Sequence, residues 1–323
     1  MMSVRAPVTL GGALAPTDVA AAAQLACLLE ASAPKPGNVS PGRHFADARY
    51  EDFLASAIAI GLPLAGAGTR PLGTTVRLAV EETARWTRSN TNLGIVLLLA
   101  PLARAALLES PVDGPIPAAQ PWTRLRSALG RVLEETSVDD AREVYAAIRR
   151  AAPGGLGRAE TQDVADEPTM TLLEVMRLAA HRDGIAREYA TAFEVTFEIG
   201  ARALEAARLD GLSWDDAIVE TYLTLLAAAP DTHVTRRGGA AVAAEVSQRA
   251  RTALAAGGVR SAAGQRAIDE MDLSLRDARN TANPGTAADL TAAAIFVVLL
   301  GGGWLASAEA SASRRSLSAT SAI

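Results

Sequence analysis

The sequence predicts an all-α fold, with one multi-helix globular domain and a polar cleft lined by the loops between helices. Alanine and leucine dominate the apolar residues, whereas valine and isoleucine are sparser. No segment sustains the alternation of apolar and polar residues that a half-buried strand requires. Apolar runs of helical length recur instead, separated by polar or proline-containing loops.

The first helix is expected at residues 19–30, where Thr17 or Asp18 can cap its start and Pro34 stops it. Further helices are predicted from the later apolar runs. Their ranges are 50–62, 72–87, 92–109, 122–135, 139–151, 171–181, 185–209, 213–229, 239–255, 262–278 and 286–305. Pro101 is expected to kink the helix in which it lies.

Two segments between these helices are rich in proline or glycine. Residues 109–121 contain four prolines and indicate a surface connection. Residues 153–168 contain a glycine cluster that could let backbone amides approach a ligand. We expect residues 1–310 to form the single domain and residues 311–323, mostly serine and alanine, to form a frayed, disordered tail.

Composition excludes several classes of protein. The 323 residues have a net charge of −5, which is typical of a globular chain and argues against a dedicated nucleic-acid binder. Cys27 is the only cysteine, so no internal disulfide can form, and the absence of a secretion signal favours the cytoplasm. The uncharged run over 290–308 is interrupted by three glycines, which predicts a buried core helix and no membrane span. The sequence leaves a homo-oligomer open.

Lys35 is the only lysine among 31 basic residues, and it lies between two prolines. A stiff backbone that holds one ammonium group would suit a phosphate ligand, although a chance surface lysine explains the same residue. His44 and Asp47 follow in the same polar loop, and each is weak as an isolated signal.

A polar run over residues 88–92 directly precedes a strongly apolar helix. The simplest interpretation is a helix cap by Thr91 or Asn92. The same geometry exposes free amides at the positive end of a helix dipole, where an anion or a ribose can bind.

Five separated aspartates lie near predicted helix ends or turns, and for each one alone capping is the simpler interpretation. They are Asp47, Asp163, Asp183, Asp231 and Asp289. If their carboxylates converge on one cleft, they can hold Mg²⁺, which takes oxygen ligands and bridges substrate phosphates. Arg236 and Arg237 precede a glycine pair and indicate either a phosphate grip or a solvated basic turn.

Several common signatures are absent from the sequence. It contains no Gly-Lys-Ser/Thr phosphate loop, no dinucleotide-binding glycine motif, no His-Glu-x-x-His helix and no paired-cysteine site. Ordinary kinases, dehydrogenases and zinc hydrolases are therefore disfavoured. The residues alone predict a helical enzyme with a Mg²⁺ and phosphate site.

Taken together, these segments resemble the triphosphoribosyl-dephospho-CoA synthase family over residues 20–300. The Pro-Lys-Pro-Gly of the family is matched at 34–37, and its Gly-x-His-x-Asp loosely at 42–47, with one extra residue before the aspartate. Its Asn-Thr stretch is similar to 90–91, its Gly-Gly-Leu-Gly to 154–157, its Asp-Val to 163–164 and its Arg-Asp to 182–183. Its late Asp-Ser-Asn and Pro-Gly-Gly-Ser-Ala-Asp elements resemble 231–233 and 284–289. So many short elements in one order make the resemblance specific.

The resemblance implies a pentosyltransferase that moves the 5-triphosphoribosyl group of ATP to a hydroxyl of 3'-dephospho-CoA or a related cofactor precursor, with release of adenine. An oxocarbenium-like transition state makes nearby carboxylates sensible. One of Asp47, Asp163 and Asp183 would act as general base, and His44 would protonate adenine.

The resemblance also implies ligands for the metal and the phosphates. Mg²⁺ would be held by Asp183, Asp231 and Asp289. Phosphate charge would be neutralised by Lys35, Arg182 and Arg236. The remaining substrate-binding positions would be Gly37, Asn90, Thr91, Gly155, Gly157 and Gly285.

Two departures from the family pattern concern the acceptor. The family's Asn-Thr-His-Lys-Gly becomes Asn-Thr-Asn-Leu-Gly over residues 90–94, which removes an imidazole and an ammonium group, and its Gly-Ala-Arg-Gly-Glu-Ala element is missing. This form resembles a divergent branch found in archaea and methylotrophic bacteria. One alternative is therefore phosphoribosyl transfer to a one-carbon carrier such as a tetrahydromethanopterin precursor. Another alternative is a non-catalytic helical binding module.

Overall fold

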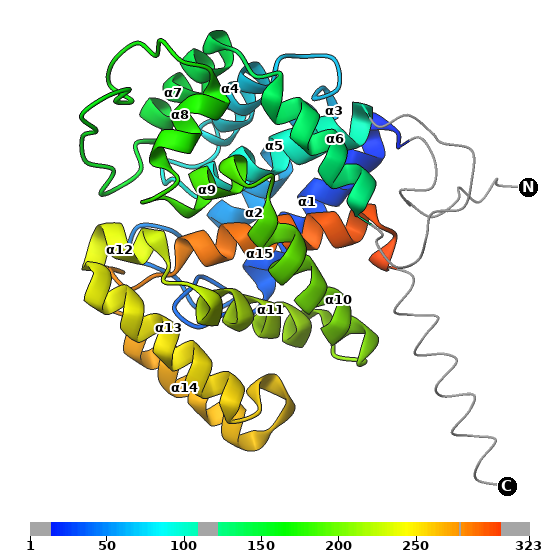
Figure 1. The fold of residues 1–323 in the computed structure, drawn as a ribbon. Helices are drawn as coiled ribbons and strands as arrows, with labels where there is room; N and C mark the ends of the chain where they lie inside the picture. The colour runs from blue at the N-terminus through cyan, green and yellow to red at the C-terminus, as the bar shows by residue number, and fades with distance from the viewer. Residues whose placement is uncertain (1–13, 109–121, 278, 305–323) are drawn as a thin grey trace, which may run out of the picture.

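Helices form nearly all the regular structure in the computed structural model, which describes residues 14–108, 122–277 and 279–304 (Figure 1). Within these ranges the only β-type pairing is an isolated bridge between Ser40 and Arg43. The predicted all-α fold is confirmed. No described helix is both long enough and apolar enough to cross a membrane.

The first half of the chain contains α1 (Pro16–Ser32), α2 (Tyr50–Ala59), α3 (Gly61–Ala65), α4 (Leu72–Thr83), α5 (Leu93–Leu108), α6 (Thr123–Glu134) and α7 (Val138–Ala151). The second half contains α8 (Leu172–Ala179), α9 (Gly184–Ala190), the π-helix η1 (Val195–Ala201), α10 (Arg202–Leu209), α11 (Trp214–Ala228), α12 (Thr232–Gly238), α13 (Ala240–Ala255), the 3₁₀-helix η2 (Gly258–Arg260), α14 (Ala262–Leu275) and α15 (Gly285–Leu300).

The core is built around α5 and α15, the two most apolar long helices. Helix α15 crosses the middle of the molecule and packs against α1, α5, α11 and η1 (Figure 1). Its residues from Leu290 to Leu300 are all buried, as expected for a helix that is apolar on every side. Helices α13 and α14 form a hairpin at the edge of the molecule.

Two predicted helix caps are wrong. Helix α1 begins at Pro16, and no side chain caps it, because proline suits a first turn whose amides lack partners. Before α5, the cap is Asn90, whose Oδ1 accepts a hydrogen bond from the Leu93 amide at 3.2 Å. Thr91 and Asn92 instead bond to side chains of α2 and α4.

The helix predicted over 185–209 is broken into three parts. Glu188 is fully buried, and its carboxylate accepts hydrogen bonds from the amides of Val195 and Thr196. Ala192 and Phe193 take left-handed conformations, with φ of +49° and +59°. The chain therefore turns before it continues as a π-helix and then as α10.

Other differences lie at helix ends. The helix predicted over 50–62 is divided into α2 and α3, α4 ends at Thr83, and α14 ends at Leu275. The short helix α12 was not expected. The predicted connection over 109–121 and the predicted tail over 311–323 lie outside the described residues.

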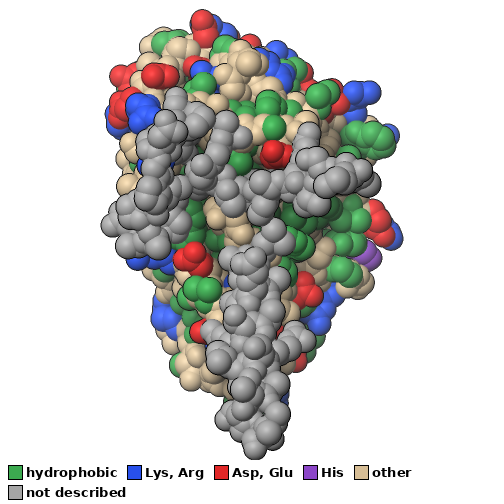
Figure 2. All heavy atoms as spheres, turned by 90° about the vertical axis from the view of Figure 1, so that its right-hand side faces the viewer, with side chains coloured by type: hydrophobic (Ala, Val, Ile, Leu, Met, Phe, Trp, Pro, Cys, Tyr) green, Lys and Arg blue, Asp and Glu red, His purple; other side chains and the backbone are tan. Residues whose placement is uncertain are grey.

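Figure 2 shows one face of the surface. Where described atoms are visible, acidic and basic side chains are mixed with apolar ones, and neither sign of charge forms a continuous strip. Charge is organised more clearly inside the molecule, at the cavity where α5 and α15 begin.

Candidate active site

A cavity of about 1180 Å³ opens where several inter-helix loops meet. Its walls come from the loop after α1, the segment before α5, the loop between α7 and α8, the turn before α9, helix α12 and the start of α15. This volume is slightly larger than that of most small-molecule sites, so the cavity can hold a nucleotide together with part of a second substrate.

Two carboxylates lie at the inner side of this cavity. Glu30 at the end of α1 is 4% exposed, and Asp289 on the first turns of α15 is half-buried. Burial, followed by the charges of Glu30 and Asp231, raises the pKa of Asp289 well above its usual value. No hydrogen bond or ion pair reaches the Asp289 carboxylate from the described part of the chain, so it is open to a ligand.

Asp289 lies directly against the first turn of α5. A Cβ atom at Gly94 would be 1.9 Å from Oδ2 of Asp289. This position therefore requires glycine, since any side chain there would displace the carboxylate.

Lys35 does not reach the cavity in this structure. It is 1% exposed, and its Nζ lies 3.0 Å from Oε1 of Glu30. Lys35 is therefore the counter-ion of a buried carboxylate. Its predicted contact with phosphate would require this buried pair to open.

A third carboxylate of the cavity wall, Asp183, is positioned between two helices. Its Oδ1 accepts a hydrogen bond from the Ala186 amide and caps α9, and its Oδ2 lies 2.5 Å from Nη1 of Arg236 on α12. The neighbouring Arg182 also lines the cavity. The predicted Arg-Asp pair and the predicted Arg236 therefore lie on one wall.

Arginines give the cavity a positive rim. Those that line it are Arg88, Arg150, Arg158, Arg182, Arg236 and Arg237. Guanidinium groups bind phosphate oxygens through paired hydrogen bonds. The cavity therefore has positive charge at its arginine rim and carboxylates deeper inside. Such a polarised cavity suits a ligand that has phosphate groups at one end and develops positive charge at another.

His233 is a half-buried histidine of the cavity wall. Burial, reinforced by the charges of Arg236 and Arg237, lowers its pKa to about 4, so the imidazole is neutral near pH 7. Its Nδ1 is buried without a hydrogen-bond partner of good geometry among the described residues. A Cβ atom at Gly285 would lie 2.3 Å from this nitrogen, which explains why glycine occupies that position.

The predicted Mg²⁺ triad does not form. Asp231 is 4% exposed, and its oxygens accept hydrogen bonds from the amides of Val234 and Ala287, so it ties α12 to α15. In the described ranges, no three His, Cys, Asp or Glu side chains are grouped as a metal site. Asp183 and Asp289 still line the cavity.

Asp163 is also a structural carboxylate. It accepts hydrogen bonds from the amides of Ala159 and Ala165, which are the main cause of its lowered pKa. It is 8% exposed and does not belong to the cavity wall, although Val164 does. Its predicted role as general base is therefore not supported by its position.

His44 lies on the surface, and its Nδ1 accepts a hydrogen bond from the Tyr50 amide at 3.1 Å. It is not part of the cavity wall, so its predicted role as acid for adenine is not supported. Gly37, Gly155 and Gly157 also lie outside the wall and have positive φ angles, so they shape the loops that adjoin it.

The structure brings together about half of the residues singled out from the sequence. Those that line the cavity are Asp47, Asn90, Thr91, Arg182, Asp183, Arg236, Gly285 and Asp289. Sequence reasoning missed Glu30 and His233. The signal for Glu30 was available, because a glutamate lies in helical register with Val19, Ala23 and Ala26, all of them buried.

Comparisons with known proteins agree on one protein family. The family model for ATP:dephospho-CoA triphosphoribosyl transferase matches residues 16–307. A Pseudomonas putida protein is 32% identical over 149 residues, or 43% of this chain and 51% of the relative. A Pseudomonas paraeruginosa protein is 38% identical over 128 residues, or 38% of this chain and 43% of the relative. Both carry the name 2-(5''-triphosphoribosyl)-3'-dephosphocoenzyme-A synthase.

The matched part of this chain spans about half the length of these curated relatives. A crystal structure from Archaeoglobus fulgidus, described as that of a triphosphoribosyl-dephospho-CoA synthase, covers more. It is 30% identical with a TM-score of 0.58, and the match covers 77% of this chain and 99% of that one.

Proposed function

Since the chain belongs to the ATP:dephospho-CoA triphosphoribosyl transferase family, we propose that it transfers the 5-triphosphoribosyl group of ATP to a hydroxyl of dephospho-CoA and releases adenine. The observation that carries the proposal is the polarised cavity, in which an arginine rim adjoins buried and half-buried carboxylates.

The reaction exchanges one bond at the anomeric carbon of the ribose. The bond from this carbon to N9 of adenine breaks, and a bond to the acceptor oxygen forms. The hydroxyl loses a proton, and the departing adenine takes one up. Positive charge develops on the ribose in between, so carboxylates near that carbon stabilise the transition state.

The arginines of the cavity suit the triphosphate of ATP, and its carboxylates suit the ribose. Arg182 and Arg236, with Arg88 and Arg150, would bind the triphosphate. Asp289 would lie beside the ribose, where a carboxylate stabilises the developing positive charge. Glu30 would stay paired with Lys35 behind it. Asp47 and Asp183 remain as candidate general bases for the hydroxyl, because both line the cavity.

Mg²⁺ would enter with the nucleotide. This ion is commonly held by one or two carboxylates together with substrate phosphates, so the absence of a three-residue cluster in the described ranges fits that mode. Asp289, with its open carboxylate, and Asp183 are the residues that would hold it. The ion would neutralise triphosphate charge.

The comparisons do not support the alternative acceptors or the non-catalytic module. The two Pseudomonas relatives and the Archaeoglobus fulgidus protein all carry the name of a triphosphoribosyl-dephospho-CoA synthase.

The test is adenine release from ATP in the presence of Mg²⁺ and dephospho-CoA, followed by chromatography. Asp183→Asn should abolish release while retaining the helical circular-dichroism spectrum, because asparagine can still cap α9. Asp216→Asn is the matched control, since Asp216 is an exposed first-turn residue of α11. Wild-type protein that forms no adenine with dephospho-CoA or with a cell extract would refute the proposed activity.

A further inference from the structure

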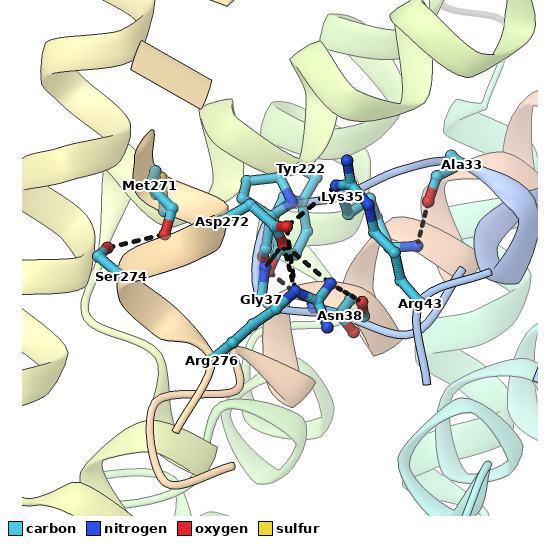
Figure 3. Close-up of polar contacts among 11 residues, drawn as sticks. Ala33, Lys35, Gly37, Asn38, Arg43, Tyr222, Met271, Asp272, Ser274 and Arg276 are labelled. Atoms are coloured by element: carbon cyan, nitrogen blue, oxygen red, sulfur yellow. Dashed lines mark hydrogen bonds and ion pairs between the residues drawn. The ribbon is translucent and has the colours of Figure 1, made fainter. Parts of the chain in front are cut away.

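Side chains from two distant helices each bind the backbone of the loop after α1, at the three consecutive residues 36–38 (Figure 3). The Tyr222 hydroxyl of α11 donates a hydrogen bond to the Pro36 carbonyl at 2.9 Å. Asp272 of α14 accepts one from the Gly37 amide at 2.8 Å, and Arg276 donates one to the Asn38 carbonyl at 2.6 Å. Side chains of α11 and α14 therefore help to position this loop, in addition to the hydrogen bonds within the loop itself.

Asp272 is the centre of this network. Its side chain is 7% exposed, and Oδ2 accepts a hydrogen bond from Nη1 of Arg43 at 3.0 Å. Both of its oxygens lie 3.0 Å from Nε of Arg276. One carboxylate thus fixes the loop at Gly37 and Arg43 and orients the arginine that binds Asn38 (Figure 3).

The loop needs such support for two local reasons. Pro34 and Pro36 have no amide hydrogen to donate, which limits bonding within the loop. Gly37 has a φ of +75°, and a Cβ atom there would lie 2.9 Å from Leu275 of α14. The loop backbone therefore packs directly on α14 in a conformation that few residues adopt.

The same network leads into the cavity. The Asn38 side chain lines it and donates a hydrogen bond to the Tyr222 hydroxyl at 2.8 Å. Farther along the loop, Phe45, Asp47 and Ala48 line the same wall. A shift at Gly37 or Arg43 would therefore move this wall relative to the opposite one.

We propose that Asp272 is a positioning residue for the proposed reaction, because from α14 it holds the backbone of Gly37 and the side chain of Arg43 and thereby sets Asn38 and the wall that follows. This inference rests on the proposed function. It assigns the α13–α14 hairpin, which contributes no residue to the cavity wall in the described ranges, a role in catalysis.

A purely structural role for Asp272 predicts a different result. In that case its replacement would lower the melting temperature and leave turnover by the folded protein unchanged. A positioning role predicts slower turnover at a temperature where the variant is fully folded, because displacement of reacting groups by about 1 Å costs about a hundredfold in rate. The arginine rim is untouched, so the KM for ATP should change little.

The experiment compares Asp272→Asn with Asp269→Asn, an exposed aspartate one turn earlier on α14. Asparagine keeps one acceptor for the Gly37 amide and removes the charge that pairs with both arginines. We expect kcat for adenine release to fall tenfold or more in Asp272→Asn, with the KM for ATP within about threefold of wild type. Asp269→Asn should match wild type in both constants.

Arg276→Met is a second variant, which removes the hydrogen bond to the Asn38 carbonyl from the other side of the network. It should show the same fall in kcat and remains informative if Asp272→Asn does not fold. Unchanged kcat in either variant, when folded, would overturn the inference, as would a raised KM with normal kcat. Failure of the proposed function is distinguishable, because wild-type protein itself would then release no adenine.

Discussion

Replacing Lys35 with methionine separates two roles for the only lysine of the chain. Met has a similar length and no charge, so Glu30 would be left buried without its counter-ion at 3.0 Å. Removing one partner of a buried ion pair typically costs about 3–5 kcal/mol. A contact with phosphate, in contrast, would leave stability unchanged and weaken ATP binding.

Urea unfolding followed by tryptophan fluorescence measures this cost. Lys35→Met should lose about 3–5 kcal/mol, and Glu30→Gln with Lys35→Met should recover much of it, because the double variant contains no buried charge at this pair. A single variant within about 1 kcal/mol of wild type but with a raised KM for ATP would refute the buried-pair reasoning.

Acylation of amines provides an independent assay for the same residue. Because Lys35 is the only lysine, a lysine-directed ester has one side-chain amine to modify. In the native protein Lys35 should resist modification, since it is 1% exposed, and in urea it should react. The terminal amine of the same chain is the internal control for reagent activity.

Three further predictions concern the cavity. His233 has a pKa of about 4 in the folded protein and an ordinary pKa near 6.5 in the unfolded chain, so between these pH values only the unfolded chain binds a proton at this residue. The free energy of unfolding should therefore fall by up to about 3 kcal/mol as the pH drops from 6.5 to 4. His233→Asn should lack this part of the decline in urea titrations at several pH values. Gly94→Ala should lower kcat for adenine release at least tenfold by displacing Asp289, whereas Gly130→Ala, where a Cβ atom meets nothing within 4 Å, should leave kcat unchanged. Arg182→Met should raise the KM for ATP about tenfold with a smaller change in kcat, because one charge-assisted contact to phosphate is lost.

Most of the helical fold could be predicted because the apolar periodicity that defines a helix is local. The middles of α5, α7, α11 and α15 fall within predicted ranges. The break after α9 could not be predicted, because it depends on Glu188 becoming buried and binding amides that follow it. Periodicity alone continues through that break.

The residues missed at the site are those whose roles depend on distant contacts. Asp272 binds the amide of Gly37 and the side chain of Arg43, more than two hundred positions away in the chain. Glu30 becomes a site residue only because α1 packs on α15 and brings it near Asp289. The helical register of α1 predicts that Glu30 is buried, but no local pattern in α1 or α14 shows which distant residues Glu30 and Asp272 meet.

The aspartates near helix ends show that this position alone does not reveal whether an aspartate caps the helix or binds a ligand in the cavity. Asp231 and Asp289 lie near adjoining helix starts, yet amides surround the first and none bonds to the second in the described structure. Asp183 combines both roles, since one oxygen caps α9 and the other pairs with Arg236. A capped aspartate therefore remains available for chemistry whenever its second oxygen faces the cavity, and this depends on which distant arginine or amide the fold places beside it.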